Sequence, residues 1–135
     1  MKAGAKMPQK HSPWKANEWG ICDSTIGTEG SDSITVNLAL KDYEKVAVGV
    51  RVHVPYYISS DSLGQTPVAT AMTGAVAVGT SGGLQEFVTG KSGFGITTTA
   101  GLLDVKITDS GAKTVYLNIC SPDGTITTIG PITFA

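Results

Sequence analysis

Charged residues are scarce in this sequence. Lys, Arg, Asp and Glu make up 16% of its 135 residues, whereas a typical soluble domain carries about 25%. This scarcity argues against a helical bundle or a coiled coil, whose exposed faces are rich in Lys, Glu and Arg. The formal net charge is only −1. A near-neutral balance argues against a protein that wraps duplex nucleic acid, so we expect no nucleic-acid partner.

Long hydrophobic runs and cysteines are also few. No stretch approaches the ~18 apolar residues of a membrane-spanning helix, and no apolar stretch follows the first lysines as in a secretory signal. We therefore expect no membrane contact. The two cysteines, Cys22 and Cys120, lie far apart and belong to no metal-ligand motif. This spacing favours two free thiols over a disulfide framework.

Small and β-favouring residues are abundant instead. Gly and Thr each occur 17 times, and 41% of the residues are hydrophobic. Thr, Val and Ile favour strands and Gly favours turns, and this apolar fraction is too high for a disordered chain. The composition predicts one small β-rich domain.

Alternation of apolar and polar residues predicts the strands. Residues 33–41 place Ile34, Val36, Leu38 and Leu40 on one face, which is the period-two pattern of a half-buried strand. Residues 48–56 alternate in the same way. Further strands are expected at 84–88, 94–99, 103–107, 115–119 and 125–134, with a weaker one within 67–78. Seven or eight short strands separated by turns predict an antiparallel β-sandwich.

Two local sequence signals refine the prediction for the last strand and the turn before it. Residues 121–124 (Ser-Pro-Asp-Gly) have the composition of a tight hairpin turn. Gly130 and Pro131 interrupt the last strand and predict a β-bulge. We expect Ile126, Thr128, Ile132 and Phe134 to share one face of that strand.

Charge is distributed unevenly along the chain. Residues 1–20 carry +3 and residues 21–135 carry −4. The first segment also holds two prolines and both tryptophans, with neither helical nor strand periodicity. We interpret residues 1–32 as an extended arm and 33–135 as the sandwich domain. A tail without any role is the alternative, but exposed tryptophans usually cover a surface. The arm residues expected to bind a partner are Lys2, Lys6, Lys10, Trp14, Lys15 and Trp19.

No motif indicates catalysis, a metal or a cofactor. The two histidines, His11 and His53, are isolated, and no serine lies in a G-x-S-x-G elbow. The D-x-D-x-D-G calcium loop is missing. Residues 93–98 (GFGITT) begin like a phosphate-binding loop but lack its third glycine. We therefore predict a protein that is not an enzyme.

Several stretches resemble known domains. Residues 34–42 (ITVNLALKD) and 46–54 (VAVGVRVHV) resemble the opening strands of bacterial immunoglobulin-like domains of the invasin type, and 101–109 with 113–119 resemble a later strand pair. The resemblance implies an immunoglobulin-like fold over about 33–134. The inter-sheet cysteine pair and packed tryptophan of antibody domains are missing.

The chain length and the Gly- and Thr-rich composition are similar to small virion proteins of tailed bacteriophages. This resemblance implies a non-enzymatic decoration (cement) protein on the particle, on the surface of the head. It would be present in many copies or as a homo-oligomer, and would bind the major capsid protein or other virion proteins through its arm. Two alternatives stay open: a tail or neck component, and an adhesion module that binds a host glycan or protein through loops such as 59–64, 80–83 and 90–93.

Overall fold

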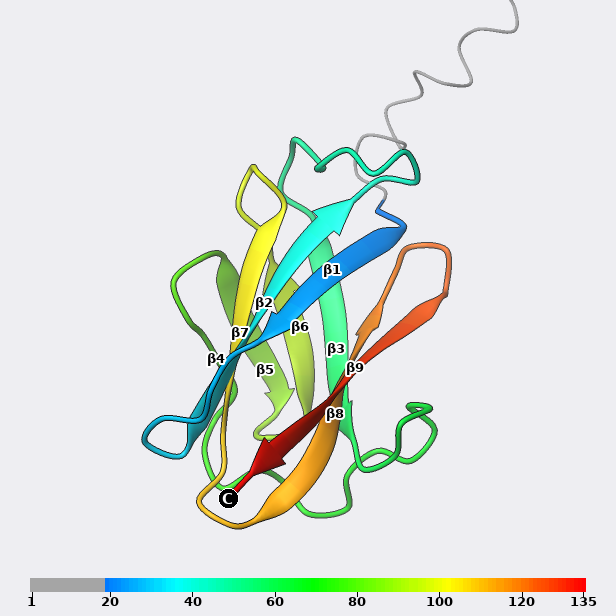
Figure 1. The fold of residues 1–135 in the computed structure, drawn as a ribbon. Helices are drawn as coiled ribbons and strands as arrows, with labels where there is room; N and C mark the ends of the chain where they lie inside the picture. Colours follow the sequence, from blue (N-terminus) through cyan, green and yellow to red (C-terminus); the bar gives the residue numbers. More distant parts are fainter. Residues whose placement is uncertain (1–18) are drawn as a thin grey trace, which may run out of the picture.

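A computed structural model describes residues 19–135 of the chain. These residues form two antiparallel sheets packed face to face, so the predicted all-β sandwich is confirmed (Figure 1). The nine strands are β1 (Ile21–Ile26), β2 (Ser33–Lys41), β3 (His53–Ser59), β4 (Ala77–Val78), β5 (Gly83–Val88), β6 (Ser92–Ile96), β7 (Leu102–Thr108), β8 (Lys113–Cys120) and β9 (Ile126–Phe134). Residues 19–135 contain no helix that could span a membrane.

The two sheets differ in size and in how the chain reaches them. The four-stranded sheet has the order β1-β2-β7-β4, and the five-stranded sheet has the order β5-β6-β3-β8-β9. Every pairing between the strands is antiparallel. The chain therefore crosses between the sheets several times, which ties the two layers into one unit.

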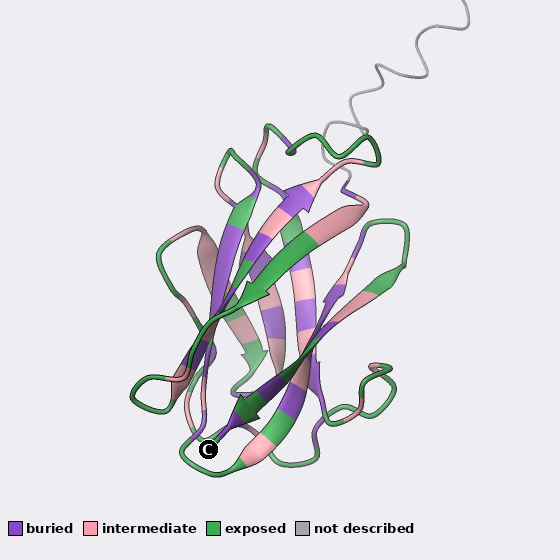
Figure 2. Ribbon diagram, viewed as in Figure 1, coloured by how far each residue is buried: buried purple, intermediate pink, exposed green. Residues whose placement is uncertain are grey.

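The alternating apolar residues form the core between the sheets. Along β2, Ile34, Val36, Leu38 and Leu40 are at most 3% exposed, while the residues between them are more exposed (Figure 2). The same alternation buries Val115, Leu117 and Ile119 on β8. Period-two burial on both layers is what a sandwich core requires.

The first strand corrects the expected boundary of the arm. All six residues of β1 pair with β2, from Ile21 opposite Lys41 to Ile26 opposite Val36. Trp19 is buried in the core as well, so residues 19–32 belong to the sandwich rather than to an extended arm. β1 is an edge strand with mostly exposed side chains, so it lacks the alternation that marks a half-buried strand.

Two other expected strands have different bounds. The strand predicted over 48–56 begins only at His53, and Val48 instead bonds through its backbone to Leu40. The weak strand predicted within 67–78 is reduced to the two residues of β4. Val48 and Val52 are buried all the same, so the apolar pattern located core residues that lie on a loop.

The last strand contains the predicted bulge. Leu117 pairs with Ile129 and Val115 with Ile132, so Tyr116 lies opposite two residues, Gly130 and Pro131. The extra residue reverses which side chains face the core. Ile129, Ile132 and Phe134 are buried, whereas Ile126 is 41% exposed. The prediction that Ile126 and Thr128 share a face with Ile132 is therefore wrong. The turn before β9 closes as expected, since Gly124 donates a backbone hydrogen bond to Ser121.

Candidate interaction surface

The predicted partner-binding residues are only partly placed. Lys2, Lys6, Lys10, Trp14 and Lys15 lie outside the described residues. Trp19 is described, and it is 1% exposed within the core cluster. Its assignment as an exposed anchor for a partner is therefore wrong, because its ring fills the end of the sandwich instead.

The chain enters the sandwich at a well-defined end. Gly20 donates a backbone hydrogen bond to Lys41 over 2.9 Å. Any side chain at position 20 would collide with the ring of Tyr43, at 2.2 Å from its nearest atom. Tyr43 in turn donates a hydrogen bond to Oδ2 of Asp123. The entry of the chain, the 42–46 loop and the β8–β9 turn thus lie together at one end of the molecule (Figure 1).

The outward strand positions of the five-stranded sheet carry no Asp, Glu, Lys or Arg. The side chains that alternate with the core residues on its strands are aromatic, aliphatic, hydroxyl, thiol or amide groups, and His53 is the one basic side chain among them. A solvent-facing sheet surface normally carries charge. Lack of charge together with exposed aromatics is the composition found in the centre of protein interfaces.

A row of aromatic rings crosses this face. The ring of Phe87 on β5 lies 5.4 Å from that of Phe94 on β6, and Phe94 lies 4.5 Å from the imidazole of His53 on β3. Both pairs are tilted, at 40° and 38°, as aromatic pairs prefer. Phe87 is 66% exposed. It lies two residues after Gln85, which is opposite Phe94 on the outer face, and the register shifts beside it, between Glu86 and Val88.

An open hollow continues the row beyond His53. It lies between the start of β3 and the β8–β9 turn and is lined by Arg51, Val52, His53, Pro55, Cys120, Ser121 and Pro122. Its lining combines two prolines, Val52 and the Cys120 thiol with the imidazole of His53 and the guanidinium of Arg51. Such a surface suits an aromatic side chain, because an aromatic ring packs against apolar groups and also attracts a guanidinium to its face.

The outer face of the four-stranded sheet is different in character. It presents Asp23, Lys41 and Lys106, and the first two form an ion pair over 2.6 Å. A second hollow there contains the buried carboxylate of Asp104. That carboxylate already accepts hydrogen bonds from the Asn37 amide and from the Thr80 and Ser81 backbone, at 3.0–3.1 Å. This face is an ordinary charged solvent surface, and its hollow serves the fold.

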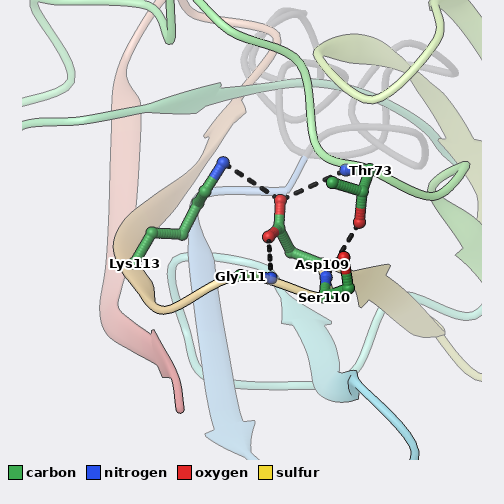
Figure 3. Close-up of polar contacts among 5 residues, drawn as sticks. All are labelled: Thr73, Asp109, Ser110, Gly111 and Lys113. Atoms are coloured by element: carbon green, nitrogen blue, oxygen red, sulfur yellow. Dashed lines mark hydrogen bonds and ion pairs between the residues drawn. The ribbon is translucent and has the colours of Figure 1, made fainter.

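The second buried carboxylate, Asp109, also serves the fold. Figure 3 shows it between two turns, where it accepts hydrogen bonds from the backbone of Thr73 and Gly111 and pairs with Lys113. Ser110 donates its backbone N–H to the Thr73 hydroxyl beside it. The carboxylate has no vacant side for a ligand. Within residues 19–135 no group of three or more His, Cys, Asp or Glu side chains is arranged to hold a metal ion.

Sequence reasoning missed Phe87 and Phe94 as surface residues. Both were placed on strands, but only the pairing shows that Phe94 lies opposite Pro55 on the outer face. His53 and Tyr57 lie on the same outer side of β3, and both are at least partly exposed. Comparison of the chain with protein-family models, with curated proteins and with solved structures found no match.

Proposed function

We propose that this chain is a non-enzymatic structural protein of a bacteriophage particle, a decoration (cement) protein that binds the capsid shell through its N-terminal segment, residues 1–18. The segment carries the +3 charge and Trp14, while residues 19–135 carry −4. The lysines would contact acidic surface of the major capsid protein and Trp14 would fill an apolar pocket there.

The burial of Trp19 is the observation that carries this proposal. Its ring is 1% exposed, and Gly20 is bonded to β2 directly after it. The lysine-rich segment is therefore joined to a rigid sandwich at a fixed point, next to the 42–46 loop. A short basic segment on a rigid acidic body suits a protein that is attached to a larger surface and presents its body outward.

The strand order supports the immunoglobulin-like fold that the sequence resemblance implies, and we include this fold in the proposal. The order β1-β2-β7-β4 in one sheet and β3-β8-β9 in the other parallels the A-B-E-D and C-F-G order of immunoglobulin constant domains. The hairpin of β5 and β6 is then an addition at the edge of β3. This is an argument about fold, since one architecture serves many functions.

The test is the amount of this chain on purified particles. Phage particles are assembled with the full chain or with a chain lacking residues 1–18, are purified on a density gradient, and the copies per particle are counted by quantitative mass spectrometry. We expect a fixed number of copies of the full chain and a loss of at least about tenfold for the truncated chain. Full occupancy without residues 1–18 would overturn the assigned role of the segment.

A matched pair of charge variants tests the lysines. Lys6→Glu with Lys10→Glu should reduce the number of copies on the particle. Lys45→Glu with Lys106→Glu, which makes the same charge change on the sandwich, should not. Absence of the full chain from purified particles, together with binding of the free chain to host cells, would instead favour the adhesion alternative. Recovery on tails rather than heads would favour a tail component.

A further inference from the structure

The aromatic row and the hollow lie side by side on one face, where the outward strand positions carry no charge and Arg51 is the one charged residue that lines the hollow. Phe87 projects at one end of the row, and the hollow beside His53 lies at the other end, with Phe94 between them. The two ring spacings, 5.4 and 4.5 Å, place the projection and the hollow roughly two aromatic rings apart. One face thus contains both an apolar projection and a recess of matching chemistry.

We propose that two copies of this chain pair through this face, with Phe87 of each copy seated in the hollow of the other. A two-fold axis that passes near Phe94 exchanges the projection of one copy with the hollow of the other. In such an isologous interface, residue i meets residue j and residue j meets residue i. The Phe94 rings then lie at the centre of the interface, where aromatic residues contribute most to affinity.

Charge favours a second copy as the occupant. Each sandwich carries −4 over residues 19–135, yet none of its acidic side chains lies on the outward positions of the five-stranded sheet. Like charges that meet directly across an interface are costly, so a face that meets itself must lack them. A partner chosen by electrostatic attraction would instead require a cluster of charged residues here, whereas the hollow has a single one, Arg51.

The 60–66 loop sets the size of the interface. The Tyr57 hydroxyl donates a hydrogen bond to Gly64, and Gly64 packs on Asn118 and Thr128. The loop thereby covers the polar part of the sheet face, and Asn118 is fully buried although it points outward. The part of the face over β5, β6 and the start of β3, which holds the aromatic row, stays open. Because the loop narrows the open surface, we expect a small interface and a reversible dimer in exchange with monomer.

The test is self-association of the purified full chain, which is measured by sedimentation equilibrium at chain concentrations from about 1 μM to about 1 mM. We expect a concentration-dependent monomer–dimer equilibrium. Phe87→Lys should weaken it by at least about thirtyfold, as for a central interface residue. Thr25→Lys adds the same charge to the exposed outer face of the other sheet and should leave the equilibrium unchanged. A strictly monomeric chain at about 1 mM would overturn the proposal.

A charge-complementation experiment tests the geometry. His53→Glu should also weaken the homodimer, because it places a carboxylate in the hollow. Mixing it with Phe87→Lys should restore a heterodimer, since the introduced amine of one chain then faces the introduced carboxylate of the other. Native mass spectrometry distinguishes the species when one chain is isotope-labelled. A wild-type dimer that both variants leave intact would show that another face is used.

Salt separates this interface from attachment through residues 1–18. An apolar interface between two acidic bodies should be unchanged or stronger at about 0.5 M than at about 0.05 M NaCl, because salt screens their repulsion. Binding by the lysine-rich segment should weaken over the same range. Self-association is measured without particles, so its failure would leave the proposed virion role intact, and loss of that role would leave the dimer intact. Self-association that weakens with salt would overturn the apolar pairing.

Discussion

Oδ2 of Asp109 lies 3.0 Å from Nζ of Lys113, and the Asp109 side chain is completely buried. The same carboxylate accepts backbone hydrogen bonds from Thr73 at 3.1 Å and from Gly111 at 2.7 Å (Figure 3). One charge thus joins the segment before β4 to the turn between β7 and β8. A buried charge is tolerated only when it is paired and hydrogen-bonded, and Asp109 meets both conditions.

Replacing Asp109 should therefore be costly. Asp109→Ala leaves two backbone N–H groups and the Lys113 amine without their partner, and we expect the free energy of unfolding to fall by about 2–4 kcal/mol. Urea denaturation measures the change. Asp23→Ala is the matched control, because Asp23 pairs with Lys41 at the surface, where an ion pair contributes at most about 1 kcal/mol. Equal effects of the two substitutions would contradict the assigned role of Asp109.

The same carboxylate predicts how stability depends on pH. Burial by itself would raise the pKa of Asp109, but the hydrogen bonds from Gly111, Lys113 and Thr73 lower it below its usual value. Hydrogen bonds from the hydroxyls of Ser121 and Tyr43 likewise lower the pKa of Asp123. A carboxyl group whose pKa is lower in the folded state stabilises the fold above its unfolded pKa of about 3.9, and that stability is lost as the pH falls through the folded pKa.

We therefore expect the free energy of unfolding to be nearly constant between about pH 5 and 7 and to fall steadily below about pH 4. Denaturation in urea at a series of pH values measures this. The Asp109→Asn variant should show a shallower decline, because it has lost one of the groups that must be protonated. Stability that rises on acidification would contradict the direction of these pKa shifts.

The structure confirms two free cysteines and gives them different environments. Burial, followed by the nearby charge of Asp23, raises the pKa of Cys22 to about 12. Cys120 lines the open hollow, and partial burial raises its pKa as well. Because the thiolate is the reactive form, both thiols should react slowly, and Cys22 the more slowly of the two.

Alkylation with iodoacetamide at pH 8 in dilute solution, followed by peptide mapping, tests this ranking. We expect label at Cys120 well before Cys22 in the folded protein and similar labelling of both in urea. A reducing agent should leave the unfolding transition unchanged, since no disulfide joins the two sites. Preferential labelling of Cys22 in the folded protein would contradict the burial that the structure assigns to it.

The parts of the fold that sequence reasoning predicted are those with a strong local signal. The alternation in β2 and β8 fixes which side chains face the core, and the Ser-Pro-Asp-Gly turn fixes the hairpin before β9. The bulge at Gly130 and Pro131 was also predicted. Its effect on Ile126 was not, although one extra residue between Ile126 and Ile132 places these two side chains on opposite faces of the strand.

The candidate surface depended on long-range pairing and was less accessible to prediction. Phe87 shares the outer face with Gln85, but the pairing of β5 with β6 decides which face of β5 is the outer one, and no local pattern marks that pairing. Trp19 was misplaced for a related reason. It follows a lysine- and proline-rich stretch, and its burial depends on β1 pairing with residues 36–41, which the sequence of β1 does not indicate by alternation.

Truncation at the N-terminus tests this placement of Trp19. Deleting residues 1–18 should change the free energy of unfolding by less than about 1 kcal/mol, because it keeps every core residue that the structure describes, Trp19 included. Deleting residues 1–20 removes a buried tryptophan, as Trp19→Ala does, and both should cost about 3–5 kcal/mol. The indole N–H has no hydrogen-bond partner among the described residues. Trp19→Phe, which keeps most of the apolar volume, should therefore cost much less than Trp19→Ala.

Fluorescence provides an independent measurement for the same prediction. In a Trp14→Phe background the remaining tryptophan is Trp19, and its burial should give short-wavelength emission that shifts to longer wavelength only on unfolding. Its quenching by iodide should be weak in the folded state, because 1% of the residue is exposed. Emission typical of a solvated indole in the native protein would contradict the burial of Trp19. Full stability after deletion of residues 1–20 would likewise show that Trp19 does not contribute to the core.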